Sequence, residues 1–74
     1  MAPLLPVLSG AEVVRAFERL GWHVARQAGS HIILVKPGER ATLSVPNHRV
    51  VAKGTLRGLI RSAGLTVDQF GGVA

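Results

Sequence analysis

The middle of the chain contains three short segments, together rich in Val, Ile and Leu, whose connecting turns suit antiparallel strands. The segments are residues 22–28, 31–36 and 41–45. Gly29-Ser30 is typical of a two-residue hairpin, and Lys36-Pro37-Gly38-Glu39 fits a type II turn, with Pro second and Gly third. Pro46 ends the third segment, because proline cannot donate to a strand ladder. This pattern predicts a three-stranded antiparallel sheet.

A helix is predicted on each side of these strands. Ser9 followed by Glu12 forms the pattern of a capping box, and Gly21 supplies a stop. The second helix is expected over residues 53–63, with Gly64 as its stop. Both helices have one apolar face, and the second also has a basic stripe. The two apolar faces consist of Val13, Val14, Phe17 and Leu20, and of Leu56, Leu59, Ile60 and Ala63; the stripe consists of Lys53, Arg57 and Arg61.

The predicted elements make up a single domain over residues 1–74. Residues 1–8 contain two prolines and are expected to form an extended lead-in. Thr66 can cap a last short turn that ends near Phe70, and residues 71–74 are expected to fray. The order α-β-β-β-α, with an antiparallel sheet and helices on one face, is an α+β fold like that of double-stranded RNA-binding domains. Topology alone does not assign a function.

Composition narrows the class of protein. A chain of 74 residues without cysteine has no disulfides or thiolate metal sites, so its core must stabilise itself. The sequence contains no apolar run long enough to cross a bilayer and no signal-peptide pattern, and we expect a cytoplasmic protein.

The net charge of +5 is concentrated in the middle of the chain. Residues 22–64 contain seven Lys or Arg residues and a single acid, Glu39, whereas the segments on either side have no excess of positive charge. The positive electrostatic field of these residues is not cancelled by nearby acids, so it attracts polyanions. The pattern favours a nucleic-acid surface over charge that serves only solubility.

Acid–base chemistry near neutral pH would have to use His23, His31 or His48. A lone histidine is more often a residue without a chemical role, so spacing alone selects none of them. His31 opens a strand directly after a turn, and His48 lies in a basic loop. A metal site is not expected, because nuclease metals use clustered carboxylates and the four acids here are dispersed.

Metal-independent RNA cleavage is compatible with these residues. It needs a base for the ribose 2′-hydroxyl, cations for the charge that develops on the phosphorus, and a proton for the leaving oxygen. One histidine and several Arg or Lys residues supply most of this. DNA would be spared because it has no 2′-hydroxyl.

Over about residues 9–70 the sequence resembles the HicA toxins of HicA/HicB toxin–antitoxin systems, which are small mRNA interferases with a fold like that of double-stranded RNA-binding domains. The likeness rests on the order and spacing of five motifs: Gly21-Trp22, Gly29-Ser30-His31, Val45-Pro46 followed by His48, Lys53-Gly54-Thr55-Leu56-Arg57 and Ala63-Gly64-Leu65. Two features depart from the family pattern. The lead-in is longer than expected, and Ile32 stands where a second histidine is common.

The resemblance implies that His31 is the catalytic residue and that Gly29 and Ser30 shape its site. It also implies a HicB-type antitoxin as partner, which would cover His31 and the basic surface, and it implies no cofactor. From charge and position we expect the RNA backbone to be bound by Lys36 and by the basic stripe of the second helix. His48 is either an RNA contact or a loop residue that fixes the turn after Pro46.

Three functions are therefore open. The leading hypothesis is a toxin ribonuclease that cleaves mRNA with His31. A non-catalytic RNA-binding module of the same fold is the alternative, although the first helix, with Glu12 and Glu18, is net neutral where a duplex binder would be expected to use it. The third is a subunit that only docks an acidic partner.

Overall fold

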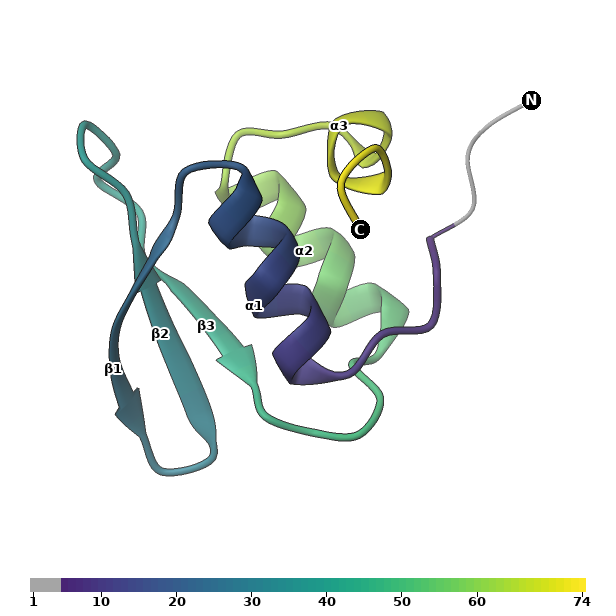
Figure 1. Cartoon of the computed structure of the whole chain (residues 1–74), viewed down its shortest axis with the longest axis horizontal. Coiled ribbons are helices and arrows are strands. Elements are labelled where there is room, and N and C mark those ends of the chain that lie inside the picture. The colour runs from purple at the N-terminus through teal and green to yellow at the C-terminus, as the bar shows by residue number, and fades with distance from the viewer. Residues whose placement is uncertain (1–4) are drawn as a thin grey trace.

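The computed structural model describes residues 5–74, and it has the predicted order of elements (Figure 1). The elements are α1 (Gly10–Arg19), β1 (His23–Ala28), β2 (His31–Val35), β3 (Leu43–Pro46), α2 (Lys53–Ser62) and α3 (Val67–Gly71). The strands form one antiparallel sheet in the order β1-β2-β3. Both long helices cover the same face of this sheet, and the other face is open (Figure 1). The α+β prediction is confirmed.

The capping box predicted at the start of α1 is present. The Glu12 amide donates to Ser9 Oγ at 3.2 Å, and the Ser9 amide donates to Glu12 Oε1 at 2.9 Å. The Ser9 amide, then the Ser9 hydroxyl and the charge of Arg15, hold the pKa of Glu12 below its ordinary value. The ionised carboxylate therefore helps to fix the position at which the helix begins.

This lowered pKa predicts an acid-dependent loss of stability. Glu12 stabilises the folded state above the ordinary glutamate pKa of about 4.3, and this contribution disappears as the pH falls below that value toward the lowered pKa. The free energy of unfolding of Glu12→Gln, measured by urea denaturation, should therefore fall less than that of the wild type on acidification. Glu18→Gln removes the same charge from α1 outside the capping box and is the matched control. Equal acid dependence of Glu12→Gln and wild type would contradict the expectation.

Both predicted turns are confirmed. Gly29 has φ of 61° and no non-glycine residue in the described chain has a positive φ, the pattern of a type II′ hairpin in which Ala28 pairs with His31. Gly38 has φ of 84° and the Glu39 amide donates to the Lys36 carbonyl at 3.0 Å, as in a type II turn. These turns fix the antiparallel order of the strands.

A β-bulge lies within β1. Val24 pairs with Leu34 and Arg26 pairs with Ile33, so Ala25 is an extra residue on the first strand. Directly paired residues of antiparallel strands point to the same side of the sheet. Leu34 is fully buried, and its side of the sheet therefore faces the helices. We call the opposite, helix-free side the outer face.

The core lies between the sheet and the helices. Phe17 of α1 is fully buried, its ring contacts that of Trp22 with centroids 6.4 Å apart, and it contacts Phe70 of α3 at 5.0 Å. The predicted apolar faces of both helices are confirmed, except that Leu20 is only partly buried. Phe70 thus ties the last helix to the first.

The two ends of the chain contribute to this core. Of the predicted lead-in, residues 1–4 lie outside the described residues, whereas Leu5 and Leu8 are buried. The expected frayed tail differs from the structure: the amides of Val73 and Ala74 both donate to the Phe70 carbonyl, and Arg19 Nη1 donates to the Val73 carbonyl at 2.9 Å. The tail is held against α1 by a residue far away in the sequence.

Candidate functional site

His31 stands at the beginning of β2, and its side chain is exposed on the outer face. It pairs with Ala28 of β1 on one side and with Pro46 of β3 on the other. Its neighbours across the sheet are therefore small or uncharged. Gly29 and Ser30 form the turn directly before it and leave its surroundings open to solvent. The structure thus presents an accessible imidazole at one end of the sheet.

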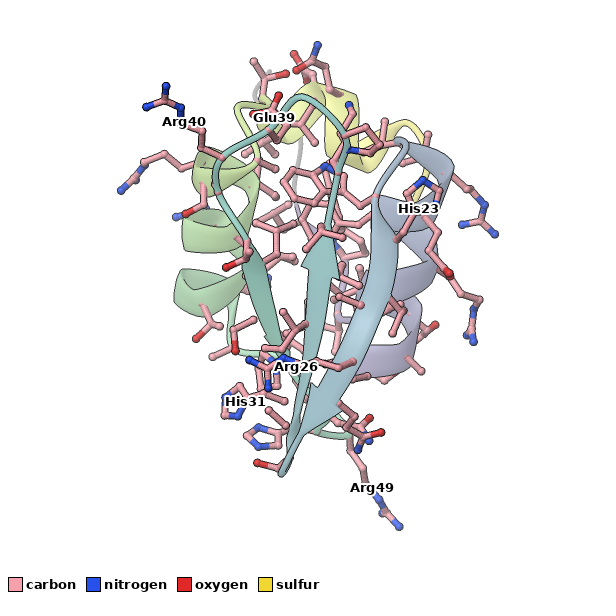
Figure 2. The ribbon with its side chains drawn as sticks, turned by 90° about the vertical axis from the view of Figure 1, so that its left-hand side faces the viewer. His23, Arg26, His31, Glu39, Arg40 and Arg49 are labelled. Atoms are coloured by element: carbon pink, nitrogen blue, oxygen red, sulfur yellow. The ribbon has the colours of Figure 1, made fainter. Side chains whose placement is uncertain are left out.

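The strand register determines what shares the outer face with His31. Arg26 and Ser44 both pair with Ile33, which lies two residues beyond His31 on β2 and so points to the same side. Figure 2 looks onto this face and shows Arg26 and His31 at one end of it, with Glu39 and Arg40 at the other. Arg26 was missing from the sequence-based set of site residues.

The loop after β3 is attached to the hairpin. The Asn47 amide donates to the Ser30 carbonyl at 2.7 Å, and the His48 carbonyl accepts from the Gly10 amide at 2.9 Å. This arrangement brings the exposed residues His48 and Arg49 to the end of the molecule that carries His31. Arg49 appears at that end in Figure 2. The predicted association of His48 with the site is thus compatible with the backbone.

Lys36 lies apart from His31. It follows the far end of β2, five residues beyond His31, which corresponds to about 16 Å of extended chain. Its Nζ donates to the Leu20 carbonyl at 3.1 Å and its stem lies over Gly21, where it caps the end of α1. A cation at this position is favourable for a helix C-terminus. The structure therefore gives Lys36 a structural contact and does not bring it together with the predicted catalytic residue.

The basic stripe of α2 also lies off the outer face. Lys53, Arg57 and Arg61 are exposed on α2, which belongs to the helical layer on the other side of the sheet (Figure 1). Arg57 and Arg61 flank an open cleft of about 320 Å³ between α2 and α3, whose other lining residues are Ile60, Leu65, Thr66 and Val67. The strand nearest to the stripe is β3, an edge strand of the sheet against which α2 packs.

Within residues 5–74 no three His, Asp or Glu side chains are grouped so that they could hold a metal ion. None of the helices in the described part of the chain has the length and apolar character that a membrane crossing requires.

Most of the chain matches the model of one known protein family. A family model described as the HicA toxin of bacterial toxin–antitoxin systems matches residues 10–65, which run from the start of α1 to the end of the turn after α2. The chain belongs to the HicA toxin family. No curated protein matches it. As a member of this family the chain is the toxin of a toxin–antitoxin pair.

The HicA match includes every predicted site residue from Gly29 to Arg61 and ends before α3. The strand register shows where Ile32, the departure from the family pattern, lies on the sheet. Ile32 pairs with the fully buried Val45 and packs against the core, so it points away from the outer face. In this HicA chain, residue 32 is therefore on the opposite side of the sheet from His31.

Arg26 could have been found from the sequence. In a two-residue hairpin with Ala28 opposite His31, the residue two positions before Ala28 must lie on the same face as His31. The predicted Gly29-Ser30 turn contained this information. The contact between Lys36 and α1 had no such local signal, because it joins residues 16 apart in the sequence.

Proposed function

We propose that this HicA toxin is a metal-independent endoribonuclease that cleaves mRNA with His31 as its catalytic residue. The observation that carries the proposal is the position of His31, exposed at one end of an open sheet face whose three strands contain no Asp or Glu, in a chain of the HicA family. A negatively charged RNA strand can approach the His31 end of this face without repulsion from carboxylates on the strands.

The reaction is an attack by the ribose 2′-oxygen on the adjacent phosphorus. Neutral His31 accepts the 2′-hydroxyl proton as the new O–P bond forms. The bond from phosphorus to the 5′-oxygen breaks, and the leaving oxygen takes a proton from solvent. The products are a 2′,3′-cyclic phosphate and a 5′-hydroxyl. The residues present in the chain supply the base and the cations without a cofactor.

The remaining predicted residues have supporting positions in this proposal. Ser30 and Gly29 keep the approach to His31 open, and His48 contacts RNA from the loop bound to the hairpin. RNA that continues around β3 meets Lys53, Arg57 and Arg61, which bind flanking phosphates. The proposal assigns no phosphate to Lys36, because its ammonium already donates to the Leu20 carbonyl. A HicB-type antitoxin would neutralise the toxin by covering the outer face.

The proposal is tested with purified protein and a long single-stranded RNA in the presence of EDTA. We expect fragments that end in a 2′,3′-cyclic phosphate, and no cleavage of DNA of the same sequence. Cleavage that EDTA abolishes, or cleavage of DNA, would contradict the mechanism. Intact RNA that is still bound in a gel-shift assay would support the alternative, a non-catalytic RNA-binding module. Absence of both binding and cleavage would favour a subunit that only docks an acidic partner.

A further inference from the structure

Arg26 is the one Lys or Arg residue within the three strands, and it stands on the face that carries His31. The bounds of β1, β2 and β3 contain neither another such cation nor an Asp or Glu. Three of the four acids of the chain lie on α1 and α3, and Glu39 lies in the turn at the opposite end of the sheet (Figure 2). The guanidinium of Arg26 is exposed and has no carboxylate on its own sheet to pair with.

The register places Arg26 within reach of a group bound at His31. Arg26 is directly opposite Ile33, and His31 is two residues from Ile33 on the same strand and the same side. Such diagonal neighbours lie about 7–8 Å apart, with their Cβ atoms somewhat closer, a separation that long side chains can bridge. Figure 2 shows the Arg26 and His31 side chains at the same end of the outer face, as this register requires.

The hairpin and the bulge together hold this arrangement. Ala28, which pairs with His31 next to the turn, has only a methyl side chain. The bulge at Ala25 lies on the other side of Arg26 and increases the local twist of the strand. Arg26 is therefore on a paired stretch of β1 between two fixed features, the two-residue turn and the bulge.

The proposed reaction at His31 needs a positive charge close to the phosphate. None of the lysines and arginines predicted from the sequence to bind RNA lies on the outer face beside His31. Negative charge grows on the non-bridging phosphate oxygens as the 2′-oxygen attacks, and pre-positioned donors at these oxygens lower the barrier. Lys36 is engaged at the end of α1, and the stripe of α2 belongs to the helical layer. A guanidinium donates two parallel hydrogen bonds to a phosphate, a geometry that an ammonium lacks.

We infer that Arg26 is a second catalytic residue, which binds the non-bridging oxygens of the phosphate attacked at His31 and stabilises their charge in the transition state. The inference rests on the proposed ribonuclease function. Arg26 only donates hydrogen bonds and takes part in no proton transfer, so the bonds made and broken are those of the proposed reaction.

The test compares Arg26→Ala, Arg26→Lys and Arg40→Ala with the wild type. Arg40→Ala removes the same charge from the far end of the sheet and is the matched control (Figure 2). Cleavage is measured in single turnover at saturating RNA, and affinity is measured with an RNA that has a 2′-deoxy residue at the cleaved position. Thermal unfolding of each variant verifies that the fold is retained.

We expect Arg26→Ala to lower the rate at saturating RNA about 100-fold, the usual effect of removing one oxyanion donor. Arg26→Lys should recover part of this rate, because it restores the charge without the paired donors. Arg40→Ala should cleave at nearly the wild-type rate, because Arg40 lies at the far end of the sheet from His31. A loss at saturation reports transition-state stabilisation, whereas a contact made equally to the bound RNA changes affinity alone.

Two outcomes would overturn the assignment of Arg26 while leaving the ribonuclease proposal intact. In the first, the wild type cleaves and Arg26→Ala retains the rate of Arg40→Ala. In the second, Arg26→Ala weakens binding of the deoxy RNA but cleaves at the wild-type rate once saturated, which would make Arg26 an ordinary backbone contact. If the wild type itself does not cleave RNA, both proposals fail. The wild-type reaction therefore distinguishes failure of the ribonuclease proposal from failure of the Arg26 assignment alone.

Discussion

His31→Ala is expected to abolish detectable RNA cleavage while leaving the fold and most of the RNA affinity unchanged. A positioned general base contributes about 10²- to 10⁴-fold to the rate, and the alanine side chain has no group that accepts a proton. His31 is exposed, so its truncation removes no core packing. Under the proposed function the affinity for RNA comes from the arginines and lysines, whose charges the substitution leaves in place.

The chain contains a matched control for this substitution. His23 pairs with Val35 and is exposed at the end of β1 remote from the hairpin, where Figure 2 shows it on the same side of the sheet as His31 but far along it. His23→Ala thus removes an imidazole from the same face without touching the site. Both variants are measured by the EDTA cleavage assay, by gel shift and by growth after induction in cells.

The two variants differ in their expected effect on growth. We expect only His31→Ala to permit growth after induction, with His23→Ala as toxic as the wild type. If His31→Ala cleaved RNA as fast as His23→Ala, His31 would not be the catalytic residue. His48→Ala would then be the next variant to measure, because the bond from Asn47 to Ser30 keeps its loop at the same end of the molecule.

Local signals explain why most of the fold was predictable from the sequence. The box formed by Ser9 and Glu12, the turns at Gly29 and Gly38, and the apolar face of α2 each depend on residues within a few positions of one another. Such features determine helix starts, strand order and the buried side of each helix. The position of His31 followed from the same hairpin, whose register also contains the unused information that Arg26 lies on the same face.

Contacts between distant segments explain the differences. The Arg19 side chain reaches the Val73 carbonyl across 54 residues, and the tail is docked where composition predicted fraying. Lys36 reaches the end of α1, so its ammonium has a structural contact at a helix terminus that its charge alone did not indicate. Neither partner is specified by spacing or by propensity. Both become visible only when the sheet has been packed against the helices.

Gly10→Ala is expected to lower the free energy of unfolding by roughly 3 kcal/mol, which is the cost of overpacking a site that cannot relax. A Cβ at Gly10 would collide with the Pro46 carbonyl oxygen and would lie 2.8 Å from the Asn47 Cα. The Gly10 amide also donates to the His48 carbonyl. Both obstacles are backbone atoms, so no side-chain rotation relieves the clash.

Helix propensity alone predicts the opposite sign, which makes the measurement decisive. Gly10 is the first residue of α1, and replacing a helical glycine with alanine normally adds about 0.5–1 kcal/mol. Gly58→Ala is the matched control: Gly58 lies within α2 with no atom within 4 Å of an added Cβ, and this variant should be more stable than the wild type. Urea denaturation gives both free energies of unfolding.

Stabilisation by both substitutions would contradict the close approach of α1 to the loop after β3. Destabilisation by Gly10→Ala together with slower RNA cleavage would mean that this approach also fixes the loop bonded to Ser30, next to His31.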